Sequence, residues 1–136
     1  MGTLPTDRTA VEPLLHVFMA TMVSSVAGNA PDLTARQLAI FLKIYLEPGT
    51  EQTVRGLAAA LNVSKPAITR ALDRLEAFNL ARREADRNDR RSVIARRTTT
   101  GSAYLRTLAD YLTKASKQEK KWPASWAGFA LRHATR

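Results

Sequence analysis

Large apolar residues recur at helical spacing near the start of the chain. Residues three, four and seven positions apart lie on one side of an α-helix, and the pattern predicts an amphipathic helix over about residues 9–28. Its apolar stripe is wide and precedes the charged part of the chain, which favours a subunit interface; burial inside one monomer is the alternative. The stripe consists of Leu14, Leu15, Phe18, Met19, Met22, Val23 and Val26.

Capping signals predict where a second helix begins. Thr34 and Gln37 have the spacing of a capping box, and Leu33 sits at the staple position before them, so the helix begins at Thr34 or very near it. Pro48-Gly49 ends it. The apolar positions in between predict one core face, formed by Leu38, Phe41, Leu42 and Tyr45.

Two short helices joined by a tight turn follow. Thr53 can cap the first and Ser64 the second, and Pro66 lacks an N–H that would have no partner in the first turn. Only residues 62–64 separate the two patterns, a spacing typical of a helix-turn-helix. Their predicted core positions are Val54, Leu57, Ala58, Leu61, Ile68, Leu72 and Leu75.

The exposed face of the second of these helices is graded in charge. Hydrogen-bond donors gather near its N-terminal end, whereas Asp73 and Glu76 lie further along. This polarity suits a helix whose N-terminus points into a nucleic-acid groove. The face comprises Lys65, Pro66, Thr69, Arg70 and Asp73.

A β-hairpin with a basic tip is predicted next. Residues 80–84 and 92–97 favour strands around the turn at 86–91. A long helix follows residues 98–101 and becomes strongly basic at Lys117, Lys120 and Lys121, and residues 126–133 have the spacing of one short amphipathic helix. The apolar positions of the long helix are Tyr104, Leu105, Leu108, Tyr111, Leu112 and Ala115.

Composition points to an anionic partner. The 136 residues carry 21 Lys and Arg against 12 Asp and Glu, a formal charge of +9, and 11 basic against 5 acidic side chains lie between Thr53 and Gly101. Such a concentration is the electrostatic footprint of a protein that follows a phosphate backbone.

Several other functions are disfavoured by residues that the chain lacks. It has no cysteine and only two, widely separated histidines, and no Gly-rich phosphate loop or assembled acid and base set is present. We therefore expect no enzyme activity, no metal site and no cofactor. The chain also lacks a signal-peptide pattern and an apolar stretch long enough to span a membrane, so we expect a soluble, cytoplasmic protein with no membrane partner.

The order of these elements and several short motifs resemble the MarR family of transcriptional regulators. The resemblance implies a single domain over 1–136, mainly α with a small β-hairpin wing (α+β). Its winged helix-turn-helix over 33–100 is flanked by N- and C-terminal dimerisation helices at about 9–28 and 101–136. The matching residues are Leu33-Thr34 with Gln37, Leu57-Ala58, residues 63–70, residues 72–76, Arg83 and Asp89-Arg90-Arg91.

The resemblance also implies a sequence-specific regulator, a homodimer bound to a palindromic operator in double-stranded DNA, with recognition helices in major grooves and wings in minor grooves. Arg91 would insert into the minor groove with Asp89 orienting it, and Arg87 and Arg90 would contact phosphates. A small aromatic or other apolar acid would relieve repression, although no motif identifies the ligand. The residues expected at bases and nearby phosphates are Ser64, Lys65, Pro66, Thr69 and Arg70.

The sequence departs from the family pattern at Asn79 and Arg97, and one alternative function stays open. Asn79 stands where the family usually has a helix-ending glycine, which is tolerable because Asn adopts the left-handed conformation. Arg97 replaces a usually apolar residue, and its charge must find a partner or reach solvent. The alternative function is nonspecific nucleic-acid binding, as in a nucleoid-associated protein, since a basic surface fits either.

Overall fold

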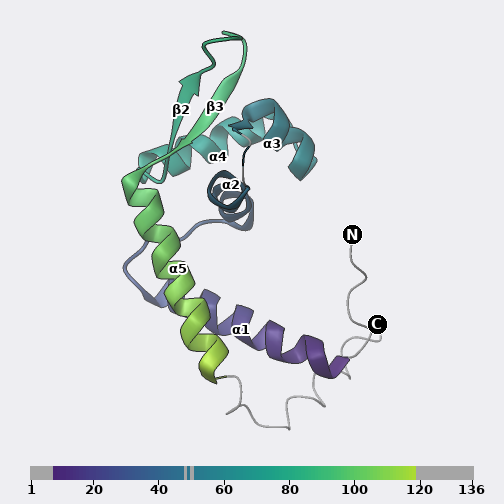
Figure 1. The fold of residues 1–136 in the computed structure, drawn as a ribbon, viewed down its shortest axis with the longest axis vertical. Helices are drawn as coiled ribbons and strands as arrows, with labels where there is room; N and C mark the ends of the chain where they lie inside the picture. The colour runs from purple at the N-terminus through teal and green to yellow at the C-terminus, as the bar shows by residue number, and fades with distance from the viewer. Residues whose placement is uncertain (1–7, 48, 50, 119–136) are drawn as a thin grey trace. The chain divides into compact units, whose positions relative to one another are not determined.

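A computed structural model describes residues 8–47, 49 and 51–118, with side chains from residue 13 onward (Figure 1). The described part is mainly α with one small antiparallel sheet of strand order β1-β3-β2. Residues 31–106 form one compact unit, and the described residues before and after them form a second. The elements are α1 (Arg8–Ala27), α2 (Ala35–Leu46), β1 (Gln52–Thr53), α3 (Val54–Leu61), α4 (Lys65–Ala77), β2 (Ala81–Ala85), β3 (Val93–Arg97) and α5 (Thr99–Gln118).

Two of the sequence predictions fall outside the described residues. The short helix predicted over 126–133 lies there, as do the basic positions Lys120 and Lys121. The helix predicted over about 9–28 and the long helix after residue 98 both form, as α1 and α5.

Side-chain caps fix where three helices begin, as the sequence predicts. Thr34 caps α2 in a full capping box: its Oγ1 accepts the Gln37 N–H at 3.2 Å, and its own N–H donates to Gln37 Oε1 at 3.0 Å. Thr53 caps α3, and Ser64 caps α4 by accepting the Ala67 N–H at 3.3 Å. Each cap satisfies a backbone donor that has no partner within its helix.

The core face of α2 is centred differently from the prediction. Leu38 and Leu42, predicted as core, are only half-buried. The helix packs against both α4 and β3, so its buried side covers two neighbours instead of the single stripe expected from spacing. The residues buried in α2 are Ile40, Phe41, Ile44 and Tyr45.

The hydrophobic core of residues 31–106 lies between α2, α3, α4 and the sheet. Aromatic packing extends it to α5, because the Phe41 ring lies 4.4 Å from Tyr45 and meets Tyr104 edge-on at 5.1 Å between ring centroids. Such pairs stabilise beyond their buried area. The largest fully buried side chains are Phe41, Ile40, Leu57, Ile68, Leu72, Leu75 and Leu80.

The sheet contains one strand that the sequence did not predict. Gln52 and Thr53 form β1 and pair with Ala95 and Ile94 of β3, whereas β2 and β3 form the predicted hairpin. A strand of two residues is too short to show alternation of apolar and polar positions. Its effect is to attach the start of α3 to the base of the hairpin.

A buried hydroxyl joins the ends of three elements. The Tyr45 hydroxyl donates to the Leu80 carbonyl at 2.7 Å and accepts the Thr98 N–H at 2.9 Å. Thr98 then caps α5, because its Oγ1 accepts the Gly101 N–H at 2.9 Å. The helix therefore begins at Thr99, slightly before the start expected from its apolar spacing.

Both departures from the family pattern find partners at this junction. Asn79 adopts φ +58°, and its side-chain amide donates to Thr100 Oγ1 at 3.0 Å. The Arg97 guanidinium donates to the Ile44 carbonyl at 2.8 Å and lies 5.9 Å from the centre of the Tyr45 ring. Arg97 thus uses a carbonyl near the end of α2 and also reaches solvent, which is how the chain accommodates the charge.

Replacement of Gly101 by alanine should destabilise the fold. A Cβ at this position would collide with the Tyr45 hydroxyl and the Leu80 carbonyl, which belong to the junction and cannot both withdraw. We expect Gly101→Ala to lower the free energy of unfolding by about 2 kcal/mol or more, measured by chemical denaturation. Gly56→Ala is the matched control, because a Cβ there meets only Thr53 Oγ1, at 3.1 Å. Equal stability of the two variants would contradict the prediction.

Candidate nucleic-acid interface

The exposed face of α4 carries the predicted base-contacting residues. Ile68, Leu72 and Leu75 are buried against the core, which turns the opposite side of the helix to solvent. Polar and basic side chains therefore stand together on the first two turns. The residues exposed on this side are Ser64, Lys65, Pro66, Thr69 and Arg70.

A tight turn sets the angle between α3 and α4. Asn62 adopts the left-handed conformation at φ +53° and ends α3, and the Val63 N–H donates back to the Ala58 carbonyl at 3.1 Å. Asparagine tolerates this conformation better than most residues with a side chain. The sequence marked the turn by its shortness but did not single out Asn62 as the residue that makes it possible.

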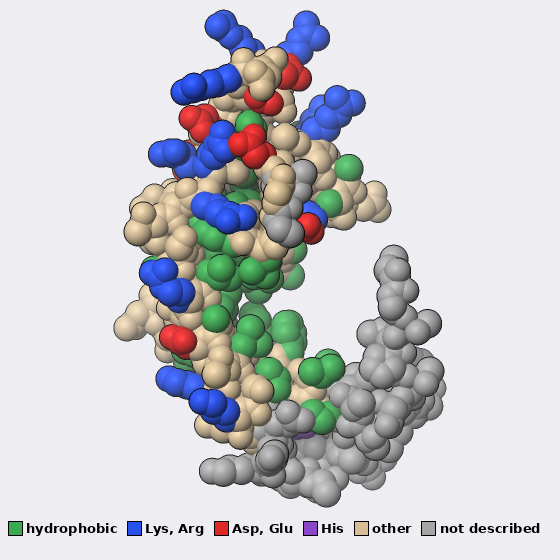
Figure 2. Space-filling model, in the orientation of Figure 1, with side chains coloured by type: hydrophobic (Ala, Val, Ile, Leu, Met, Phe, Trp, Pro, Cys, Tyr) green, Lys and Arg blue, Asp and Glu red, His purple; other side chains and the backbone are tan. Residues whose placement is uncertain are grey.

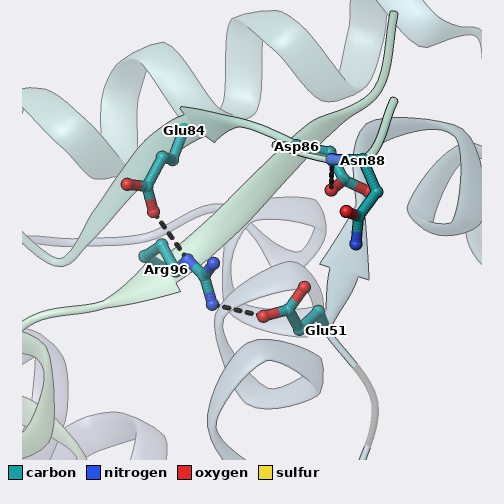
Figure 3. Close-up of polar contacts among 5 residues, drawn as sticks. All are labelled: Glu51, Glu84, Asp86, Asn88 and Arg96. Carbon is teal, nitrogen blue, oxygen red and sulfur yellow. Dashed lines mark hydrogen bonds and ion pairs between the residues drawn. The ribbon is translucent and has the colours of Figure 1, made fainter. Parts of the chain in front are cut away.

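The tip of the hairpin is shaped by two aspartates acting on the backbone. Asp86 Oδ1 accepts the Asn88 N–H at 2.9 Å, and Asp89 Oδ1 accepts the Arg91 N–H at 3.1 Å; Figure 3 shows the first of these contacts. Between the strands, the Asp86 N–H donates to the Ser92 carbonyl at 2.9 Å. Such side-chain to backbone bonds fix short turns.

The family resemblance predicts that Asp89 orients the Arg91 side chain. In the described part of the chain, the Asp89 carboxylate bonds the Arg91 backbone N–H, and no ion pair joins the two side chains. Asp89 thus positions Arg91 by shaping the turn, and the guanidinium stays exposed. Arg87 and Arg90 are exposed beside it, and Figure 2 shows Lys and Arg side chains projecting around this end of the hairpin.

Arg83 ties the hairpin to α4. Its guanidinium on β2 donates to Glu76 Oε2 at 3.0 and 2.7 Å and pairs with Asp73 Oδ1 at 2.5 Å. The hydrogen bond to Glu76 is the main cause that raises the pKa of Arg83, with Asp73 adding to it against the opposing effect of partial burial. The two acids on the far part of α4 therefore serve the fold.

Arg96 forms a second clamp at the base of the hairpin. Figure 3 shows its guanidinium between Glu84 of β2, at 2.8 Å, and Glu51, at 2.5 Å. The hydrogen bond from Arg96 lowers the pKa of Glu84. A carboxyl with a depressed pKa stabilises the fold above its unfolded-state pKa, and this contribution is lost as the pH falls. The clamp is therefore intact at neutral pH.

The basic side chains fall into two groups by their partners. Arg83 and Arg96 are held by carboxylates, and Arg97 by a carbonyl. Within the described residues, no ion pair holds the basic side chains of the exposed α4 face or the hairpin tip. On the exposed face of α4 and the hairpin tip, the cations free to meet an external anion are Lys65, Arg70, Arg87, Arg90 and Arg91.

Other kinds of site find no support in the described residues. Within them, no group of three or more His, Asp or Glu is placed to hold a metal ion. None of the helices described is both long and apolar enough to cross a membrane. The exposed face of α4 and the hairpin tip are accordingly the candidate site.

Comparison with known proteins agrees with this geometry. The sequence model of the MarR family matches residues 30–92, and no curated protein sequence matches the chain significantly. The structure is similar to the transcriptional regulator Tm0710 from Thermotoga maritima, with TM-score 0.71 and 22% identity over 96% of this chain and 89% of that one.

Two further structures share the fold. A mutant of MarR from E. coli has TM-score 0.61 and 23% identity, with 100% of both chains covered. The S. aureus MepR–DNA complex has TM-score 0.62 and 19% identity over 84% of this chain and 87% of that one. Likeness at this identity gives the fold, a winged helix. The segment 30–92, which holds the helix-turn-helix and the hairpin up to its tip, is similar in sequence to the MarR family.

Proposed function

We propose that the protein is a transcriptional regulator that binds a specific site in double-stranded DNA. The observation that carries this proposal is the division of its cations: the arginines near the core are paired, whereas those on the exposed face of α4 and the hairpin tip are not. Unpaired Lys and Arg can displace the counterions condensed on DNA and so supply affinity.

The two parts of the site fit two grooves of the duplex. An α-helix is about 10–12 Å across and the major groove about 12 Å wide, so α4 can enter it with its polar face toward the bases. Arg70 offers a bidentate donor suited to guanine. The hairpin tip is narrow and basic, and Arg91 at its end suits the minor groove.

The functional unit of the proposal is a homodimer formed through α1 together with the C-terminal helices. Large apolar side chains of α1 are exposed in one protomer, among them Leu14 at 65%, Phe18 at 61% and Val23 at 60%, and Figure 2 shows hydrophobic side chains gathered over this helix. A monomer rarely leaves so large an apolar patch in water. Two-fold symmetry would then require a palindromic operator with half-sites about 34–36 Å apart.

The proposal also covers the effector, the absence of catalysis and of a cofactor, and the cellular compartment. Resemblance to the family supports relief of repression by a small aromatic or other apolar acid, with no enzyme activity and no cofactor. A regulator of this kind acts on chromosomal DNA, so the proposal implies the cytoplasm as its compartment.

Nonspecific nucleic-acid binding is the competing function. A competition experiment distinguishes the two functions, because a regulator retains one site against an excess of random duplex DNA.

Binding to duplex DNA should weaken steeply with salt. If Lys65, Arg87 and Arg90 of both protomers meet phosphates, about six contacts form, and the logarithm of the association constant should fall with the logarithm of salt concentration at a slope of about −5. Fluorescence anisotropy with a duplex selected from a random pool measures this slope. Affinity that is independent of salt, or absent at low salt, would rule out the proposal.

The helix and the hairpin tip should contribute differently to recognition. Arg70→Ala removes a base contact and should reduce discrimination at one base pair by about 1–3 kcal/mol. Arg91→Ala should weaken binding to the selected site while the major-groove preferences persist. Arg106→Ala, an exposed arginine of α5 outside the site, is the control. Selection from a random pool with each variant decides, and identical behaviour of all three would contradict the assigned docking.

A charge on the apolar face of α1 should break the dimer. Phe18→Asp alters a side chain that is 61% exposed in the protomer, so the protomer should fold while the desolvated charge opposes association. Leu46→Asp is the matched control, because Leu46 is equally exposed, at 61%, on α2. Sedimentation velocity at micromolar concentration should give a monomer for the first variant and a dimer for the second. Dimers in both would exclude this face as the interface.

A further inference from the structure

A groove lies on one flank of α4, beside the exposed helix face, with which it shares Arg70, and away from the hairpin tip. It has a volume of about 390 Å³ and runs between α4 and the first turn of α2, two helices that lie side by side in Figure 1. Buried Ala67 and Ala71 form its α4 side, and their small side chains let the first turn of α2 approach. Arg36 and Arg70 line it, and no acid does.

Arg36 occupies a position that does not favour the stability of α2. It is the second residue of the helix, and the first turn contains no acidic side chain. The N-terminal end of a helix carries partial positive charge, so a cation there is repelled. Within the described residues, no ion pair compensates for this repulsion, and the Arg36 side chain is exposed. An external anion would compensate for it.

We infer that Arg36 binds a backbone phosphate at the edge of the major groove entered by α4. This inference rests on the proposed function and adds to it a positioning residue that lies outside the helix-turn-helix and the wing. A helix about 10–12 Å across nearly fills a groove about 12 Å wide, so each flank of α4 approaches one row of phosphates. The groove lined by Arg36 and Arg70 lies on such a flank.

The contact made by Arg36 is with phosphate and carries no base information. Arg36 belongs to α2, whereas the side chains that face the bases belong to α4. A phosphate contact fixes the register of the protein on the duplex without reading sequence. Removal of the charge should therefore weaken binding to all duplexes alike.

The salt slope of an Arg36 variant tests the inference. Each protomer of the dimer contributes one Arg36, so Arg36→Gln should reduce the slope by about 1.8 and weaken binding about thirtyfold at 0.15 M salt, with unchanged base preference. Arg36→Lys should keep most of the slope because it keeps the charge. Arg106→Gln, which makes the same charge change on α5, should leave the slope unchanged. The melting temperature of Arg36→Gln should stay the same or rise. Weaker DNA binding by this variant would then come from the lost phosphate contact and not from unfolding.

Neutral phosphates in the DNA identify the contact itself. In the selected duplex, single phosphates are replaced one at a time by uncharged methylphosphonates. At one position the replacement should weaken DNA binding by the wild type but leave DNA binding by Arg36→Gln unchanged. Duplex binding with equal slopes for wild type and Arg36→Gln would overturn the inference and leave the proposed function standing. A changed base preference in Arg36→Gln would overturn it as well. Failure of the wild type to bind any duplex would overturn both.

Discussion

The hydrogen bonds of one buried hydroxyl hold the candidate site in its shape. Tyr45 projects from α2 and bonds the Leu80 carbonyl, just after α4, and the Thr98 N–H, just after β3. One oxygen atom thus bonds both the segment that follows the helix expected in the major groove and the segment that follows the hairpin expected in the minor groove. Position 101 requires glycine because there is no room for a side chain beside this hydroxyl. A buried polar group with satisfied partners specifies one arrangement, whereas apolar packing alone tolerates several.

Charge in this protein serves structure and recognition through different residues. Arg83 and Arg96 each meet two carboxylates, and these pairs connect β2 to α4 and β3 to the segment before β1. Partly exposed pairs of this kind contribute modestly to stability, but they fix geometry and leave the tip cations without acidic partners. Sequence composition reports only the sum, so the positive excess between residues 53 and 101 conceals two populations with different roles.

The sequence predicted most of the fold because its signals are local. The caps at Thr34, Thr53 and Ser64, the apolar spacing of α4 and the turn at Asn79 each depend on neighbours within a few residues. What escaped prediction depends on distant partners. The strand β1 exists only because β3 lies beside it, and Ile40 and Ile44 are buried because α2 has two neighbours.

For the candidate site, the sequence predicted the exposed residues but not what holds them. The two clamps and the backbone role of Asp89 required the three-dimensional arrangement, because Arg96 and Glu51 are 45 positions apart. Arg97 shows the same limit: spacing indicated a charge in need of a partner, and the carbonyl that serves it lies 53 positions away. Arg36 went unremarked because an isolated basic residue in a helix has no pattern of its own.

The two aspartate turns at the hairpin tip have a consequence for the thermodynamics of association. Asp86 and Asp89 hold the backbone around Asn88 and Arg91 before any partner is present. Fixing the backbone of one residue costs about 1–2 kcal/mol in conformational entropy, and a loop that is ordered only on contact would subtract this from its affinity. In this protein the cost is met during folding, so the preorganised tip can retain more of its interaction free energy when it binds.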